Sequence, residues 1–184
     1  MGARNKLLAE IDGVAMVRRV IEAVIASKAD PVVVVTGHEA ERVRGALNGL
    51  AVAFVDNPDF EDGISASLRH GLAALPQDCD GVLVCLGDMP RVDAAMLDTL
   101  IAAFAPERGK DICVPVHQGK RGNPVLWGKR HFTEMRDVAG DVGAKHLIGR
   151  NADAVQEVAI DQDGVLIDVD SPDALAALTS RRNS

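Results

Sequence analysis

The sequence predicts an α/β fold in which helices cover both faces of a mostly parallel sheet. Short apolar runs rich in β-branched residues alternate with amphipathic stretches of helical period from Val14 to Val116. Several of these runs end in Thr, Gly, Asp or Asn, as buried parallel strands do where their loops begin. Strands that alternate with helices imply right-handed crossovers between neighbouring strands.

The first expected elements are a helix at 14–26 and a strand at 32–35. Apolar residues recur every three to four positions in the first segment, with Arg18, Arg19 and Glu22 between them. The second segment is a run of four valines after Pro31, apolar on both faces. We therefore expect an amphipathic helix followed by a strand that is covered on both sides.

The same alternation predicts the elements that follow. Further helices are expected at 39–47, 65–75 and 94–104, and further strands at 51–55, 81–86 and 112–116.

The regular alternation of predicted strands and helices ends after Val116. The Gly-rich stretch 118–124 leads into 125–127, and we expect this segment to leave the sheet as an excursion such as a hairpin arm. Beyond it, 155–160 and 165–169 are expected to be short strands. A last helix is expected at 172–178, with Ser171 as its cap and Pro172 at its first position.

Length and charge exclude several classes of protein. A chain of 184 residues suits one compact domain. The net charge of −7 argues against a broad surface for nucleic acid or anionic membranes, which needs clustered Lys and Arg. No apolar run approaches the roughly 18 residues that span a bilayer, and the first residues lack the apolar core of a signal peptide. A cytoplasmic location is expected.

Cysteine and histidine are too scattered to indicate a metal or disulfide framework. The three Cys are unpaired in spacing and are expected to be buried small apolar residues. The five His include no pair at helical ligand spacing, and each is expected at the surface or at a helix cap.

Polar residues follow several of the predicted strands. Because the carboxyl ends of parallel strands meet at one edge of the sheet, we expect these residues to share one rim. They are 36–38, 56–57, 87–88 and 168–170.

Asp88 is the strongest candidate for a functional residue at this rim. It emerges from an apolar strand between Gly87 and Met89, where its carboxylate suits Mg²⁺ that also binds substrate phosphates. An equally good reading is an aspartate that caps the turn before Pro90. Asp168 and Asp170 have the spacing that places both on one face of a strand, so one of them is a candidate partner of Asp88. Both also suit a plain role beside a helix N-terminus.

Three other segments have residue types that suit an anionic ligand. Gly63 and Ser65 lead into a helix, where Ser65 can cap and the helix N–H groups can face an anion or a base edge. Arg121–Asn123 combines a guanidinium, a flexible glycine and an amide. Lys6 is a further candidate cation. A capped helix, a solvated loop and a surface lysine are the respective structural alternatives.

Six segments in order resemble one family. MGARNKLLAEIDG, NPDFEDGISASLRHG, LVCLGDMP, GKRGNPVLW, GDVGAKHLI and DVDSPDAL resemble the signature segments of the MobA-like nucleotidyltransferases. The resemblance is closest to the molybdenum cofactor cytidylyltransferase branch and covers essentially the whole chain. It implies a single three-layer α/β/α domain over 1–184, Rossmann-like and similar to the nucleotide-diphospho-sugar transferases.

The resemblance also implies that the first strand is missing. Family members begin with a strand and a loop of the form L-A-A-G-x-S-x-R-M-G, of which Met1 and Gly2 would be the last two residues and Lys6 the following lysine. The chain is therefore expected to be N-terminally truncated or an excerpt from a longer chain, such as a fusion protein. A missing central strand would leave two unpaired strand edges or a cavity.

The activity that the resemblance implies is transfer of CMP from CTP to the terminal phosphate of molybdopterin, with release of pyrophosphate. Mg²⁺, or Mn²⁺ in its place, is the implied cofactor, and an apo-molybdoenzyme of the xanthine dehydrogenase type is a further expected partner. The implied roles are metal ligation by Asp88 and Asp170, catalysis by Lys6 and Asp88, nucleotide binding by Lys6, Asn57, Gly63 and Ser65, and pterin binding by Arg121, Gly122 and Asn123.

Other functions are open from the sequence. Transfer of GMP from GTP to the same cofactor, or of a nucleotide to a sugar phosphate, fits the same rim. A GT-A-like glycosyltransferase would use Asp168-Val169-Asp170, although its D-x-D motif normally lies in mid-chain. A non-catalytic chaperone that delivers molybdopterin is the alternative from a different class.

Overall fold

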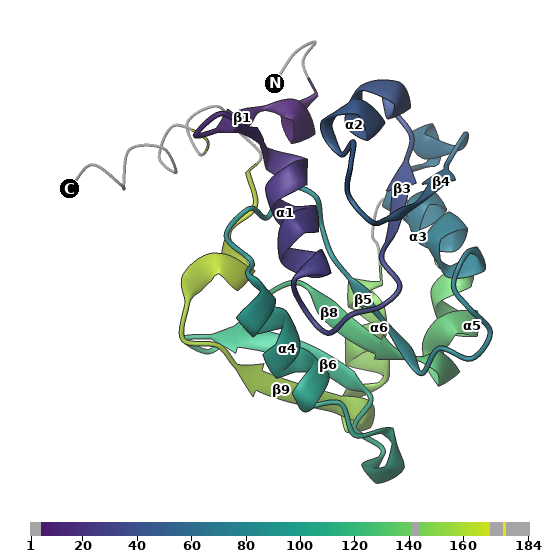
Figure 1. Cartoon of the computed structure of the whole chain (residues 1–184). Coiled ribbons are helices and arrows are strands. Elements are labelled where there is room, and N and C mark those ends of the chain that lie inside the picture. The colour runs from purple at the N-terminus through teal and green to yellow at the C-terminus, as the bar shows by residue number, and fades with distance from the viewer. Residues whose placement is uncertain (1–4, 141–143, 170–174, 176–184) are drawn as a thin grey trace.

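The structure is a computed structural model that describes residues 5–140, 144–169 and 175. Its architecture is a central sheet with helices on both sides, which confirms the predicted three-layer α/β/α class (Figure 1). The helices are α1 (Met16–Ile25), α2 (Ala40–Ala46), α3 (Ile64–Ala73), α4 (Ala94–Ala102), α5 (Phe132–Arg136) and α6 (Lys145–Arg150). Within the described residues, none of them is long and apolar enough to cross a membrane.

The strands fall into a main sheet and two smaller pairs. The main sheet has the order β5-β8-β6-β7, and β9 pairs with β6. A parallel pair β3-β4 and an antiparallel hairpin β1-β2 stand beside it. The bounds are β1 (Glu10–Ile11), β2 (Val14–Ala15), β3 (Val33–Thr36), β4 (Ala53–Asp56), β5 (Gly81–Val84), β6 (Ile112–His117), β7 (Lys120–Arg121), β8 (Val125–Gly128) and β9 (Val155–Ala159).

The main sheet is mixed, which corrects the prediction of a mostly parallel one. β8 lies between β5 and β6 and is antiparallel to both, whereas β6 and β9 are parallel. The expected excursion at 125–127 is therefore wrong, because this strand occupies the middle of the sheet. Its residues are all buried, so its apolar run reflects coverage on both faces.

Alternation along the strands divides the core into two faces. Ile112, Val114 and Trp127 pack with α3, α5 and α6, whereas Cys113 and Leu126 pack with Met96 and Leu100 of α4. Successive side chains of a strand point to opposite faces, so a strand buried on both sides contributes to both clusters.

Two predicted elements near the ends take other forms. The helix predicted at 14–26 begins only at Met16, because Val14 and Ala15 pair with Ile11 and Glu10. Residues 165–169 do not form the predicted strand: Asp163–Leu166 form a 3₁₀ turn, η6, and the chain then runs on without pairing as a strand. The helix predicted at 172–178 lies outside the described residues.

Among the described residues, β3 pairs only with β4 and β5 pairs only with β8. Each of these two strands thus has one edge that receives no ladder hydrogen bonds from the described chain. Packing continues across this division, since Val24 of α1 and Leu97 of α4 share a cluster with Val32, next to β3, and Leu83 of β5. Helix packing therefore connects the two parts of the sheet.

Truncation of Leu100 should be costly. Leu100 of α4 is fully buried, whereas the next residue of the helix, Ile101, is partly exposed. Leu100→Ala is expected to lower the free energy of unfolding by about 2–5 kcal/mol through lost burial and a residual cavity. Urea unfolding followed by the fluorescence of Trp127, the single tryptophan, measures this change. Ile101→Ala is the matched control, and equal losses in the two variants would contradict the packing described for α4.

Candidate active site

An ion pair between distant parts of the chain forms the centre of the candidate site. Lys6 Nζ donates to Asp88 Oδ2 at 2.7 Å. The Asp88 side chain is 16% exposed and that of Lys6 is 33% exposed, so the pair lies at the surface of the core and not deep within it. A ligand that approaches this rim can therefore reach both groups.

The second oxygen of Asp88 is buried and has no hydrogen-bond partner among the described residues. A buried carboxylate oxygen without a donor or cation costs free energy, so such atoms point to an occupant. The carboxylate bonds only to Lys6, which excludes the alternative that Asp88 caps the turn before Pro90. The position of Asp88 follows from β5, which ends four residues earlier at Val84.

A short 3₁₀ turn, η1 (Lys6–Leu8), carries Lys6 to Asp88. Asn5 caps this turn by accepting a hydrogen bond from Leu7 N at 3.1 Å. The Asn5 side chain also donates to His38 O at 3.5 Å, just beyond the end of β3. Leu7 lies against Gly87, where an added Cβ would stand 3.2 Å from Leu7 Cδ2. The turn is thus held to two of the strand ends that the sequence places at the rim.

The C-terminal part of the chain reaches the same place. Val169 N donates to Asp88 O at 2.9 Å, and Val169 packs with Ile11 and Met16. This hydrogen bond brings 168–169 beside Asp88, as predicted. Asp168 is exposed, and Asp170, the predicted second metal ligand, lies outside the described residues.

The residues present fit a divalent ion only in part. The described residues contain no group of three or more His, Cys, Asp or Glu that could hold a metal. Asp88 offers one oxygen without a partner, so an ion there would take its other ligands from substrate oxygens and water, as Mg²⁺ commonly does. Burial raises the pKa of the Cys85 thiol to about 12, so this neighbour in sequence is neutral and supplies no thiolate ligand.

The predicted nucleotide-binding residues lie around the start of α3. Asn57 is buried, accepts from Asp59 N at 3.0 Å and donates to Ser67 Oγ at 3.0 Å. These bonds use both ends of the amide to hold the β4–α3 connection. Gly63 has φ 89°, a backbone conformation that favours glycine at the N-cap of α3.

Ser65 does not cap α3, which corrects that part of the prediction. The N-cap is Gly63, and no side chain caps the helix. Ser65 is fully buried, and its Oγ accepts from Arg69 at 3.4 Å. Its backbone N–H donates to Gly140 O at 3.3 Å, so the loop that ends at Gly140 lies over the start of the helix.

The predicted pterin-binding segment is attached to the segment that reaches Asp88. Asn123 N donates to Val165 O at 2.9 Å, and a Cβ on Gly122 would stand 2.1 Å from the same oxygen. Arg121 pairs with Glu157 of β9 at 2.7 Å, and both side chains are about half exposed. The structure therefore connects 121–123 to Asp88 through residues 163–169.

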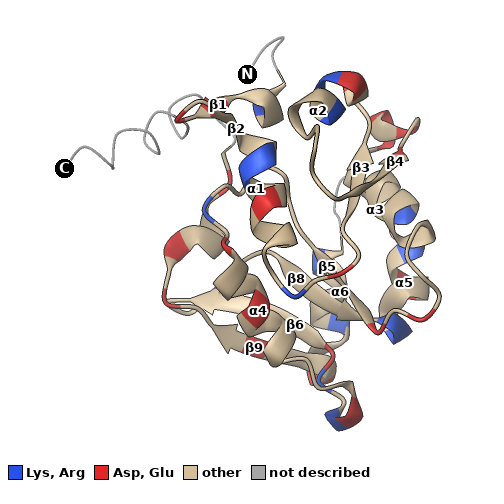
Figure 2. Cartoon of the chain, viewed as in Figure 1, with Lys and Arg blue, Asp and Glu red and all other residues tan. Residues whose placement is uncertain are grey.

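Positive and negative residues are interspersed over the described part of the chain. In the view of Figure 2, segments with Lys or Arg lie among segments with Asp or Glu. This agrees with the net charge of −7 and with local recognition of an anion by a few groups.

A buried pair that the sequence does not reveal lies elsewhere. Asp111 and His131 are 2% and 5% exposed, and His131 Nε2 lies 3.2 Å from Asp111 Oδ1. His131 stands at the N-cap position of α5, in agreement with the expectation of a surface or cap residue, but its side chain is buried and makes no capping hydrogen bond. Its place beside Trp127, at a ring distance of 6.1 Å, depends on β8 entering the sheet.

Comparison with protein families shows which family the chain belongs to. The model of the MobA-like NTP transferase domain matches residues 1–155. The chain belongs to the MobA-like NTP transferase family. The family match includes the Lys6–Asp88 pair and the segment 121–123.

Curated relatives match over part of their length. The bifunctional protein GlmU of Cupriavidus necator is 34% identical over 137 residues, which are 74% of this chain and 28% of that protein. The GlmU of Leifsonia xyli is 37% identical over 103 residues, 55% of this chain and 21% of the relative. The chain thus spans less than a third of these relatives.

Solved structures match over nearly the whole fold. Rv0371c from Mycobacterium tuberculosis is 26% identical with a TM-score of 0.80, covering 96% of this chain and 90% of that one. A manganese complex of Rv0371c has a TM-score of 0.81 at 24% identity and covers 95% of this chain and 90% of that one. The CMP:2-keto-3-deoxy-manno-octonic acid synthetase complexed with CTP shares the fold, with a TM-score of 0.77 at 12% identity and coverage of 100% and 94%.

A methyl group at Gly122 should disturb the connection to Asp88. The added Cβ would overlap the Val165 carbonyl, so backbone must move. We expect Gly122→Ala to lower the free energy of unfolding by about 1–3 kcal/mol, as overpacking does. Gly45→Ala is the control, because its Cβ meets nothing within 4 Å and α2 gains helix propensity. Urea midpoints compare the two, and a neutral Gly122→Ala would show that 163–169 is loosely held.

Proposed function

We propose that this protein is a divalent-metal-dependent nucleotidyltransferase that moves CMP from CTP to the terminal phosphate of molybdopterin. The observation that carries the proposal is the Asp88 carboxylate, with one oxygen 2.7 Å from Lys6 Nζ and the other buried without a partner. Membership of the MobA-like NTP transferase family supports nucleotidyl transfer. The resemblance of the signature segments to the cytidylyltransferase branch supports CTP and molybdopterin.

The proposed reaction replaces one phosphoanhydride bond by another. A terminal phosphate oxygen of molybdopterin attacks the α-phosphorus of CTP, and the bond from that phosphorus to the bridging oxygen of the β-phosphate breaks. Pyrophosphate leaves with that electron pair. The attacking oxygen is already anionic, so alignment and charge neutralisation are the main requirements and no general base is needed.

Lys6 and Asp88 divide these requirements. Lys6 Nζ, at the partly exposed side of the pair, stabilises negative charge on the phosphates. The free oxygen of Asp88 would hold Mg²⁺ or Mn²⁺, which when bound supplies positive charge at the α-phosphate. The crystal structure of Rv0371c in complex with manganese supports such an ion in a protein of this fold. Asp170 is the proposed second ligand.

The remaining residues have proposed roles in positioning. Gly63 and Ser65 begin α3 on the nucleotide side, where Asn57 holds the approach to the helix through its two amide bonds. Arg121 is proposed to face the pterin with Gly122 and Asn123. Its exposed pair with Glu157 contributes little stability, so an anionic substrate can displace the carboxylate.

Asp88→Asn should remove the metal dependence of nucleotide binding. In the presence of Mn²⁺ we expect the substitution to weaken CTP binding at least about tenfold, because the ion loses its protein carboxylate. Without the ion, affinity should stay equal or rise, since the amide no longer neutralises Lys6. Isothermal titration calorimetry of the 184-residue chain with and without MnCl₂ measures both.

The control for this experiment is Asp78→Asn, an exposed aspartate before β5. It should bind CTP like the original chain in both conditions. If Asp88→Asn keeps its full response to Mn²⁺, Asp88 is not a metal ligand and the proposed site is wrong.

Lys6→Gln should slow the chemistry. Loss of the ammonium removes charge stabilisation in the transition state, and we expect pyrophosphate release from CTP with molybdopterin to fall by about tenfold or more. Lys28→Gln, an exposed lysine beyond α1, is the control. An unchanged rate in Lys6→Gln would remove Lys6 from catalysis.

A second candidate is nucleotidyl transfer to a sugar acid or sugar phosphate. The shared fold of the CMP:2-keto-3-deoxy-manno-octonic acid synthetase favours it. Pyrophosphate release measured with CTP and GTP against molybdopterin and sugar phosphates separates these reactions. Binding of the pterin without turnover of either nucleotide would instead indicate a non-catalytic molybdopterin-binding chaperone.

A further inference from the structure

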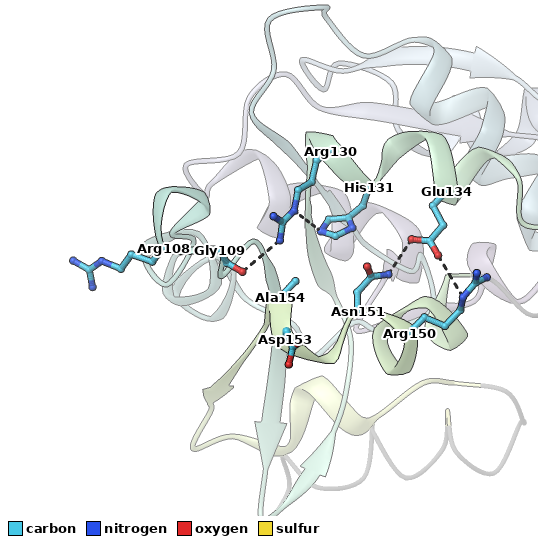
Figure 3. A pocket seen from close by; sticks show the side chains of 9 residues that line it. All are labelled: Arg108, Gly109, Arg130, His131, Glu134, Arg150, Asn151, Asp153 and Ala154. Atoms are coloured by element: carbon cyan, nitrogen blue, oxygen red, sulfur yellow. Dashed lines mark hydrogen bonds and ion pairs between the residues drawn. The ribbon is translucent and has the colours of Figure 1, made fainter.

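A polar cavity lies at the end of the main sheet opposite Asp88. Its volume is about 640 Å³, in the range of sites for small metabolites. The cavity is lined by Arg108, Gly109, Arg130, His131, Glu134, Arg150, Asn151, Asp153 and Ala154 (Figure 3).

The strand directions place this cavity far from the rim. Ile112 and Val155, the first residues of β6 and β9, follow the lining segments 108–109 and 153–154. β8 ends at Gly128, and Lys129 N donates to Asp80 O just before β5 begins. The cavity therefore lies at the amino ends of β5, β6 and β9, whereas Asp88 follows the carboxyl end of β5.

Arg130 is held at the cavity by a buried carboxylate. Its Nη2 lies 2.6 Å from Asp111 Oδ1 and 3.4 Å from Gly109 O. Asp111 is 2% exposed and fits against Gly128, where an added Cβ would stand 2.5 Å from Asp111 Oδ2. A buried carboxylate needs such partners, and it fixes the guanidinium in return.

Arg150 lies at another wall of the cavity, where it also pairs with a carboxylate. Glu134 Oε1 lies 3.6 Å from Arg150 Nε, and Glu134 Oε2 accepts from Asn151 Nδ2 at 2.9 Å. The Arg150 side chain is 69% exposed. Figure 3 shows Arg130 and Arg150 on different sides of the lining, with Glu134 and Asn151 between them, whereas Arg108 points away.

Both guanidinium groups keep N–H donors for a ligand. No described protein atom accepts a hydrogen bond from Arg130 Nη1 or from either Nη of Arg150. Arg130, fixed by the buried Asp111, is preorganised for a polar ligand, since little further ordering is needed on binding. Arg150, which is mostly exposed and 3.6 Å from Glu134, can turn to meet a phosphate.

The acidic groups of the lining restrict the ligand further. Glu134 and Asp153 would repel a ligand that carries only negative charge, but they accept hydrogen bonds from hydroxyl groups. We propose that this cavity binds a small phosphorylated sugar or polyol, with the phosphate on Arg150 and the hydroxyl groups on Arg130, Glu134, Asn151 and Asp153. This site is separate from the nucleotidyl-transfer rim and does not depend on the function proposed for it.

Titration of the ¹⁵N-labelled chain with glucose 6-phosphate tests the proposal. We expect backbone amide shifts at Gly109, Asn151 and Asp153 in a saturable manner, and much smaller shifts with glucose or inorganic phosphate alone. Because a sugar phosphate can also reach the rim as a substrate, shifts at Lys6, Gly87 and Asp88 are recorded separately. Shifts confined to the rim, or none at either place, would overturn the proposal.

Arg150→Gln should weaken glucose 6-phosphate binding at the cavity at least about tenfold, because a charge-assisted hydrogen bond is lost. This variant keeps the buried Asp111–Arg130 pair intact, so its fold is not at risk. Arg136→Gln on α5, exposed and outside the lining, is the matched control and should bind normally. Equal affinity in Arg150→Gln and the original chain would show that the arginines only stabilise the surface.

Discussion

The contact on which the candidate active site depends is the one at Asp88. Its side chain pairs with Lys6 near the start of the described chain, and its backbone carbonyl accepts a hydrogen bond from Val169 near the end. Three segments that are distant in sequence therefore meet at one residue. The carboxylate oxygen without a partner shows that these contacts leave the site incomplete, as expected where a cation or substrate binds.

The two ends of the main sheet offer different chemistry. At the carboxyl end of β5, the Asp88 carboxylate pairs with Lys6 and keeps one buried oxygen without a partner among the described residues. At the amino ends, Asp111 and Glu134 each pair with an arginine at the wall of a cavity. Both places pair a carboxylate with a cation, and the cavity adds carboxylate acceptors that can meet hydroxyl groups. This difference suits a nucleoside triphosphate with its metal at one end and a smaller hydroxylated anion at the other.

Local periodicity predicted α1 to α4 and most strands because each buries a face against the rest of the core, whereas the short helices α5 and α6 were not predicted. The valine run at β3 and the apolar run at β5 were found to within about two residues for this reason. Pairing was harder to predict. The residues of β8 are buried on both faces, so their pattern is the same whether the strand runs parallel or antiparallel, and only contacts with β5 and β6 decide its direction. The 3₁₀ turn at Asp163–Leu166 was mistaken for a strand because its apolar residues pack against the core without pairing.

From the sequence alone came the α/β class, the rim of polar residues at strand ends, and the choice of Asp88, because residue type and position along a strand carry that information. The choice of Lys6 came from the family resemblance of the segment around it. Tertiary structure alone decided that Asn57 uses its amide internally, that Ser65 accepts from Arg69 and caps nothing, and that His131 is buried on Asp111. The physical reason is that hydrogen-bond partners of buried polar groups come from segments far away in sequence. Their geometry exists only once the sheet has brought those segments together.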